Sequence, residues 1–567
     1  MTFLGATRCR ALASIAACSL VGAALRIMRL GSLGLVHFDE GIYASAGLWS
    51  VVPGGMDRID PMVIPYAPPA YPFLVGVSYL LLGVSDLAVV MPSIMGGILT
   101  ISVVGWVAWR SFGPQAGVAA SAFAALSGAH VALSRMALTD ASFLFAWLVA
   151  IGIGQRFVEQ PRLSRAVILG LAVGLAQYFK YNGWLTGVAT ALAVILGLAL
   201  DPMERRAGRV VRMSALGLVA ALVAALVYGP WFRFVDSNGG YAALLAHQRG
   251  YMGGLSSWLP YWNSQMAQGV ALSGGPAWGG MAMILAFSGV WFTGPKFREV
   301  RGTAIYGIVA VCAVMLLACA PMLSWWVALG WTLGPWAARP VAARVLGGWW
   351  LSLAVMTPFY HPYARLWLPL HAASWIIFAG VIASLVPLLS RRDGAARPAV
   401  MPRRVPWVIG LVAAIAIGHF CMDTPRPRPL RGLLGRSDSV RTACNDLTRV
   451  LPADVPGLRL LARPPVRFYL ALSGRGPLRT EPDSRSLLRS TDPASWLVVD
   501  EALLRQEGDA SVARRQLMGS YEVVDEWQTE LNVPSLLDVD PASARRGSEA
   551  RSASLLLLRP RRPRVSP

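Results

Sequence analysis

The chain has 567 residues, of which 55% are hydrophobic and only 14% are charged. The mean hydropathy of +0.51 is well above what the surface of a water-soluble enzyme of this size tolerates. The apolar residues come in long blocks, and Gly and Pro show no fixed period, which excludes disordered, collagen-like and coiled-coil chains. The composition therefore predicts a mainly α-helical, multi-pass membrane protein.

The chain is strongly basic, with 51 Lys and Arg against 30 Asp and Glu and a net charge of +21. In a soluble domain this excess would suggest nucleic acid as a partner. Here most basic residues stand in short stretches between apolar blocks, as is typical of cytoplasmic loops that lie against an anionic leaflet. We therefore expect membrane lipids, and no nucleic acid, among the partners.

The first apolar block runs from about Ala11 to Leu30 and follows Arg8 and Arg10. It lacks a convincing small-residue cleavage site, so we interpret it as a retained first span with a cytoplasmic N-terminus. Further spans of roughly 17 to 24 residues are long enough to cross the hydrocarbon layer. They begin near Leu87, Gln115, Ala141, Ala166, Trp184, Met213, Pro276, Thr303, Pro321, Val345, Leu366 and Val405. The sequence thus predicts a bundle of about thirteen transmembrane helices.

The apolar stretch Tyr71–Val84 is short against the ~20 residues that a span needs. If it is not a crossing, the basic loops between later spans all fall on the cytoplasmic side, as the positive-inside rule favours. We therefore predict an interfacial or re-entrant helix within a first outer loop of about residues 31–85. The loops that decide the matter contain Arg110, Arg162, Arg165, Arg205, Arg206, Arg209, Arg212, Lys296, Arg298, Arg301, Arg339, Arg344, Arg391, Arg392, Arg403 and Arg404.

The chain changes character from about residue 422, where a Pro/Arg linker gives way to short apolar runs and more charge. We expect a transmembrane domain over residues 1–421 and a small extracytoplasmic α/β domain over residues 422–567. GLRLLA, SWLVVD, YEVVDEW and SLLLLR are typical of strands, and SVRTACNDLTRVL and PVRFYLALSG of helices. This domain carries no nucleotide, metal or nucleophile motif, which favours a lid or docking role.

Ionisable residues at the outer ends of the spans are the candidates for chemistry, because such residues are scarce in this chain. The first are Asp39 and Glu40, in HFDEGIYASAGLW directly after the first span. Adjacent residues of a helix point in different directions, so one carboxylate can face a cavity while the other supports it. Helical apolar spacing follows Asp39, so an N-cap role for Asp39 is an equal alternative.

Two further candidates lie at the next outer ends. SRMALTD contains Arg135 and Asp140, which could pair with each other or place an acid and a cation beside Asp39. QYFKYNGW contains Lys180, which either extends to the interface or faces inward to bind a phosphate.

The last candidates are in FYHPYARLWLPL, where His361, Tyr363 and Arg365 cluster at the start of a late span. Arginine suits bidentate phosphate contact, and an arginine that extends to the interface is the alternative. The sidedness that places all these groups on the outer face uses neither Lys180 nor Arg365. One acid, two separated cations and apolar walls suit a lipid-phosphate donor whose tail stays in the bilayer.

These segments resemble the GT-C class of integral membrane glycosyltransferases, especially the branch of the protein O-mannosyltransferases and the lipid A aminoarabinose transferase. The likeness is carried by HFDEGIYA, APPAYPFLVGVSYLLLGVSDLAVVMPSIMGG, ALSRMALTDASFLF, GLAVGLAQYFKYNGW and HPYARLWLPL. Their order and spacing cover most of residues 1–380.

The resemblance implies a role for each matching residue. Asp39 resembles the catalytic base, Glu40 its acidic neighbour, Lys180 the lysine on the donor phosphate and Arg365 the arginine of the late motif. Asp140 resembles an acid that helps to hold a divalent metal in oligosaccharyltransferase relatives. The chain has Ala67-Pro68-Pro69 where relatives often carry a metal ligand, and Arg365-Leu366 where they often have Arg-Tyr, so the need for a metal stays open.

The implied activity is transfer of a sugar, with inversion, from a polyprenyl-phosphate donor to a lipid, glycan or protein acceptor at the outer face of a cell inner membrane. A polyprenyl-lipid flippase or transporter is the alternative. The absence of a repeat between the two halves, and charges at one face rather than at the midplane, argue against it. A membrane-anchored scaffold that acts through its C-terminal domain is the third reading.

Overall fold

The structure is a computed structural model. It describes residues 3–49, 51, 68–199, 203–237, 240–274, scattered positions between 278 and 289, 323–334, 340–389, 438–452, 455, 457–474, 478–481, 495–507, 510–530 and 552–561. The boundary expected near residue 422 lies outside these ranges, and so do the spans expected to begin near Thr303 and Val405.

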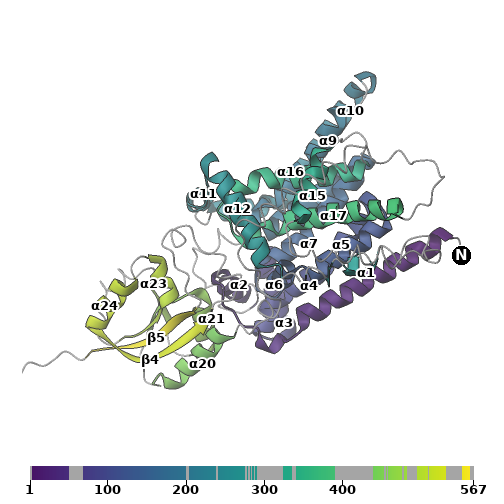
Figure 1. Ribbon diagram of the computed structural model, residues 1–567. Coiled ribbons are helices and arrows are strands. Elements are labelled where there is room, and N and C mark those ends of the chain that lie inside the picture. The colour runs from purple at the N-terminus through teal and green to yellow at the C-terminus, as the bar shows by residue number, and fades with distance from the viewer. Residues whose placement is uncertain are drawn as a thin grey trace, which may run out of the picture.

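The membrane part is a bundle of helices, as predicted (Figure 1). Its helices are α1 (Phe3–Ile27), α2 (Phe38–Trp49), α3 (Ala70–Leu82), α4 (Asp86–Phe112), α5 (Pro114–Leu126), α6 (Gly128–Ser134), α7 (Thr139–Glu159), α8 (Leu163–Phe179), α9 (Leu185–Ala199), α10 (Met203–Ser237), α11 (Gly240–Arg249), α12 (Leu255–Ala271), α15 (Leu323–Leu333), α16 (Val341–Met356) and α17 (Leu368–Leu389). Short 3-10 turns are η1 (Leu30–Ser32), η4 (Tyr181–Trp184), η5 (Thr357–Phe359) and η6 (Ala364–Trp367).

Within the described ranges, 6 helices are long and apolar enough to cross a membrane, or 7 if the bent pair α5 and α6 forms one broken span. The chain is therefore a multi-pass membrane protein. The total of about thirteen spans stays a prediction. Helix α3 has 13 residues and is not among the 6, in agreement with its expected shortness, because 13 residues extend only about 20 Å.

The centre of the bundle is built on α4, which packs against α1, α5 and α7. Ser85 caps α4 by accepting a hydrogen bond of 3.3 Å from the backbone N–H of Ala88. Where α4 meets α6, a Cβ at Gly97 would lie 2.2 Å from the Ser134 hydroxyl oxygen. Glycine at this position lets the helices approach closely, as is common in membrane bundles.

Three of the basic stretches that decided the predicted sidedness, those of Arg110, Arg165 and Arg212, lie at one end of the bundle. Arg110, in the last turn of α4, forms an ion pair with Glu159 at the end of α7. Arg165 donates to the carbonyl of Arg156 at 2.7 Å, and Arg212 donates to the carbonyl of Pro161 at 2.8 Å. Since α7 runs from Thr139 to Glu159, this end is about 30 Å from the start of α7.

The C-terminal region contains the small α/β domain that the sequence predicts. Its sheet has the strand order β2-β1-β3-β5-β4, with β1 parallel to β2 and β3, and β5 antiparallel to β3 and β4. The elements are α20 (Ser439–Val450), β1 (Leu458–Leu461), α21 (Pro464–Leu472), β2 (Leu478–Thr480), β3 (Trp496–Asp500), α23 (Glu501–Glu507), α24 (Ala510–Ser520), β4 (Tyr521–Glu530) and β5 (Ser552–Pro560).

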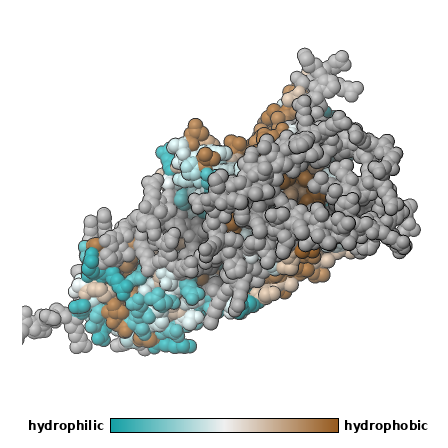
Figure 2. Space-filling view, viewed as in Figure 1, coloured by the Kyte–Doolittle hydropathy of each residue, from teal (hydrophilic) through white to brown (hydrophobic). Residues whose placement is uncertain are grey.

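All four expected strands and both expected helices of this domain are present. The apolar run of β5 is buried on both faces, which is why it reads as continuous rather than alternating in the sequence. Helices α20 and α21 lie between the sheet and the end of the bundle that holds α2 and α3, and the N-terminus of α1 lies at the far end (Figure 1). The visible surface is mostly hydrophilic over this domain and more hydrophobic over the bundle helices (Figure 2).

Candidate active site

The acidic pair sits in the first turn of α2. The helix begins at Phe38, so Asp39 lies inside it rather than in the N-cap position that the sequence left open. The preceding residue, His37, accepts a hydrogen bond of 3.1 Å through Nδ1 from the backbone N–H of Asp39. The first turn of α2 therefore leaves the Asp39 carboxylate available for other partners.

The Asp39 carboxylate forms an ion pair with the guanidinium of Arg365. These two residues are 326 positions apart, and η6 presents the arginine just before α17 begins. The side chains are 24% and 17% exposed, so this pair is only partly enclosed. The sequence predicted both residues as site residues, and the structure brings them into contact.

The carboxylate of Glu40, in contrast, accepts hydrogen bonds among the described residues from the backbone only. One carboxylate oxygen accepts from the N–H groups of Val36 and His37, and the other accepts from the N–H of Ala137, each at 2.8 Å. Burial raises the pKa of Glu40, and the three backbone donors act against that rise. Glu40 thus joins the start of α2 to the segment that leads into α7, in keeping with the supporting role expected for one of the two acids.

A second ion pair lies at the start of α7. Asp140 accepts a hydrogen bond of 2.6 Å from the ammonium of Lys180, which stands between α8 and η4. The Asp140 side chain is 2% exposed, and its second oxygen has no hydrogen-bond partner among the described residues. The ammonium also lies 5.9 Å from the ring centroid of Phe143.

The two ion pairs belong to one electrostatic site. Burial would raise the pKa of Asp39, but the charge and hydrogen bond of Arg365, together with the charge of Lys180, act against burial, and this pKa lies below its ordinary value of 3.8. Asp39 is therefore ionised at neutral pH. Lys180 lowers the pKa of Asp39 although its ammonium is paired with Asp140, so the two ion pairs interact electrostatically.

Arg135 does not form the ion pair with Asp140 that the sequence allowed. It donates to the carbonyls of Arg26 at 2.9 Å and Met28 at 2.5 Å. These carbonyls stand at the C-terminal end of α1, where a cation satisfies backbone acceptors that the helix leaves open. The partner of Asp140 is Lys180 instead.

His361 and Tyr363 stand behind Arg365. The guanidinium carbon of Arg365 lies 5.5 Å from the ring centroid of Tyr363, within cation–π range. The rings of Tyr363 and His361 meet edge to face with centroids 5.0 Å apart. The backbone N–H of His361 donates to the carbonyl of Tyr251 at 2.7 Å, which ties this segment to the turn after α11. Both residues thus support the arginine.

Tyr43 of α2 is a candidate site residue that the sequence analysis did not identify. It is buried one helical turn after Asp39. Burial raises the pKa of its hydroxyl, and the charges of Asp39 and Asp140 raise it further. The spacing of four residues after Asp39 is the signal that would have found it.

A divalent metal was an open expectation, with Asp140 as its candidate ligand. Within the described part of the chain, no three His, Cys, Asp or Glu side chains come together as a group that could hold a metal ion. Asp140 offers one open oxygen and has a lysine on the other. These residues do not make up a metal-ligand set.

Part of the chain matches the model of a known protein family. Residues 66–231 match the family model of the dolichyl-phosphate-mannose-protein mannosyltransferases. No curated protein matches the chain.

Solved structures with a similar course of the chain include ArnT from Cupriavidus metallidurans in the apo state, with 14% identity over 96% of this chain and 97% of that chain and a TM-score of 0.47. The same protein bound to undecaprenyl phosphate gives 15% identity over 96% and 97% of the two chains and a TM-score of 0.42. The oligosaccharyltransferase of Archaeoglobus fulgidus, in complex with Zn and sulfate, has 13% identity over 88% of this chain and 70% of that chain, with a TM-score of 0.49.

The matched segment, residues 66–231, contains Asp140 and Lys180, and the acidic pair of α2 lies before it. The match to this family confirms the predicted enzyme class, a membrane glycosyltransferase, and the resemblance of the chain to the protein mannosyltransferase branch of that class.

Proposed function

We propose that the protein moves a sugar from a polyprenyl-phosphate donor to a lipid, glycan or protein acceptor at the outer face of a cell inner membrane, with inversion. The observation that carries this proposal is the meeting of two acids and two cations from four distant segments at one end of the bundle. Arg110, Arg165 and Arg212 lie at the opposite end, as expected if that end is cytoplasmic.

The base of the reaction is Asp39. Its carboxylate takes the proton from the acceptor hydroxyl or amine while the acceptor atom attacks the anomeric carbon. The bond from that carbon to the phosphate oxygen breaks on the opposite face, and the polyprenyl phosphate leaves with the electron pair. A single displacement of this kind inverts the anomeric configuration.

Lys180 and Arg365 bind the donor phosphate and stabilise the charge that develops as it leaves. Without donor, each cation is held by a carboxylate, so neither is buried unpaired. A phosphate that takes Arg365 away from Asp39 weakens the interaction that holds the pKa of Asp39 down. The carboxylate then becomes a stronger base when the donor is in place.

The test is transfer from a panel of radiolabelled polyprenyl-phosphate sugars to endogenous acceptors, with membranes that contain the wild-type protein or Asp39→Asn. Transfer by the wild type that is lost in the variant supports the proposal and identifies the donor. Full transfer by a folded Asp39→Asn protein would contradict the assignment of the base. Translocation of the lipid without transfer would favour the flippase alternative.

A further inference from the structure

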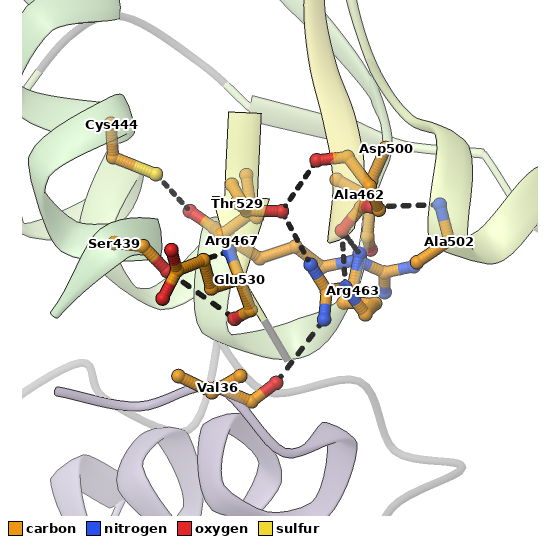
Figure 3. A network of polar contacts seen from close by, with 12 residues as sticks. Val36, Ser439, Cys444, Ala462, Arg463, Arg467, Asp500, Ala502, Thr529 and Glu530 are labelled. Carbon is orange, nitrogen blue, oxygen red and sulfur yellow. Dashed lines mark hydrogen bonds and ion pairs between the residues drawn. The ribbon is translucent and has the colours of Figure 1, made fainter. Parts of the chain in front are cut away.

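The C-terminal domain contacts the short segment that carries the catalytic candidates. Arg463, just before α21, is buried and binds within its own domain to Asp500 at 2.5 Å and to the hydroxyl of Thr529 at 3.3 Å. Its remaining nitrogen, Nη1, donates to the carbonyl of Val36 at 3.3 Å, as Figure 3 shows. A buried charge of the sheet domain thus reaches the backbone three residues before Asp39.

A second contact from α21 holds the neighbouring residue. The hydroxyl of Tyr469 accepts a hydrogen bond of 2.7 Å from the backbone N–H of Leu35. The same hydroxyl donates to the carboxylate of Asp86, at the start of α4, at 2.8 Å. Arg441 of α20 binds the other oxygen of that carboxylate at 2.5 Å. Asp86 therefore anchors the domain on the bundle beside residues 35 and 36.

The contact continues on the other side of Asp39. A Cβ at Gly41 would lie 2.1 Å from the backbone nitrogen of Pro465 and 2.2 Å from the carbonyl carbon of Pro464. Only glycine allows α2 to come this close to the start of α21. The domain thus touches residues 35, 36 and 41 and encloses the acidic pair from one face.

The bundle holds the same segment from the other face. Glu40 ties Val36 and His37 to Ala137 before α7, and Arg365 binds the carboxylate of Asp39. The first turn of α2 is therefore fixed between the two domains. Neither domain alone supplies all of these contacts.

We propose that the C-terminal domain is part of the active site, with Arg463 and Tyr469 as positioning residues that hold residues 35–41 so that Asp39 meets Arg365. This inference rests on the proposed function for its effect on turnover. Neither residue contacts the Asp39 carboxylate, so both act through the backbone of residues 35 and 36. An error of about 1 Å in the place of a catalytic group can cost up to about 100-fold in rate.

The test compares Tyr469→Phe and Arg463→Lys with two matched control variants in the full-length protein. Tyr521→Phe alters another buried tyrosine of the same domain, and Arg459→Lys alters another buried arginine, which pairs with Glu481 at 2.9 Å. Neither control residue contacts residues 35–41 in the described structure.

Two measurements are made per folded molecule. The first is turnover with a donor from the panel, together with the Kd for undecaprenyl phosphate. We expect about tenfold lower kcat for Tyr469→Phe and Arg463→Lys, an unchanged Kd, and wild-type values for the controls. The second is hydrogen exchange of the Leu35 amide, which we expect to become faster in Tyr469→Phe and to stay unchanged in Tyr521→Phe.

Wild-type turnover in both test variants, or equal losses in test and control variants, would overturn the proposal. Unchanged exchange of the Leu35 amide in Tyr469→Phe would overturn it as well. If the wild-type protein transfers no sugar, the proposed function fails, and the exchange measurement still decides whether the domain holds this segment.

Discussion

The membrane part and the C-terminal domain both pair arginine or lysine with carboxylates, but the pairs differ in how closed they are. In the sheet domain, the side chains of Arg459 and Glu481 are 2% and 5% exposed. Arg459 lies in β1, and Glu481 directly follows the neighbouring strand β2. In the bundle, the pair of Asp39 and Arg365 is partly open and joins two segments that are 326 residues apart in the sequence.

This difference in exposure separates ion pairs that stabilise the fold from ion pairs that can take part in the reaction. A closed pair whose polar atoms are satisfied specifies packing, and its loss is felt as lost stability. A partly open pair at the meeting point of distant segments can exchange its partner for a ligand. The open oxygen of Asp140 and the accessible Lys180 fit the second kind.

The largest effect after loss of the base is expected for Lys180→Met. Removal of one group that stabilises the leaving phosphate costs about 100- to 1000-fold in kcat. The variant also leaves Asp140 buried without its cation, which destabilises the fold. The double variant Lys180→Met/Asp140→Asn removes that charge, so we expect it to recover thermal stability but not transfer. Recovery of transfer in the double variant would show that Lys180 has only a structural role.

A pH dependence follows from the pair of Asp39 and Arg365. In the wild type the pKa of Asp39 lies below 3.8, so activity falls on the acid side only as pH drops below that value. In Arg365→Gln the strongest opposing charge is lost while burial still raises the pKa. We therefore expect the acid limb of kcat/KM to move to higher pH, besides a lower maximum. An acid limb that stays in place would argue that another group titrates.

Glu40→Gln separates the two neighbouring acids. In the wild type, both carboxylate oxygens of Glu40 accept hydrogen bonds from backbone N–H groups. Glutamine has only one oxygen, so its NH₂ group would point at backbone N–H donors and leave them unsatisfied. We expect a loss of about 1–3 kcal/mol in stability from the unsatisfied buried groups, seen as a lower thermal unfolding temperature. Transfer per folded molecule should fall far less than in Asp39→Asn. Equal losses would make Glu40 a direct participant.

The smallest effect is expected at an exposed pair in the C-terminal domain. Arg449 and Asp446 are three residues apart on α20, at 3.0 Å, and both are well exposed. Arg449→Ala should change stability by less than about 0.5 kcal/mol and leave transfer unchanged. A large effect on transfer would show that this exposed surface has a role in the reaction, which the distinction between open and closed pairs does not predict.

Much of this arrangement could be predicted from the sequence because its signals are local. Long apolar blocks, basic loops and short strand-like runs are periodic or compositional features, and they identified the bundle and the sheet domain. The scarcity of ionisable residues at the predicted outer ends singled out Asp39, Asp140, Lys180 and Arg365, and the resemblance gave each a role. The structure pairs them as Asp39 with Arg365 and Asp140 with Lys180.

What the sequence could not supply are contacts between distant segments. Arg135 and Asp140 are close in sequence and suggested a pair, but the fold turns Arg135 towards α1 and brings Lys180 to Asp140. Likewise, nothing local marks Tyr469 as a partner of Leu35, 434 residues away. Such contacts depend on how complete domains pack together, which periodicity does not encode.

The central claim is that Asp39 is the catalytic base, and the most direct measurement is sugar transfer per folded molecule by Asp39→Asn. Asp446→Asn is the matched control, because it makes the same change in an exposed carboxylate of α20, which pairs with Arg449. Loss of general base catalysis predicts a fall of about 100- to 10,000-fold for Asp39→Asn and wild-type transfer for the control. Wild-type transfer by a folded Asp39→Asn protein would contradict the account.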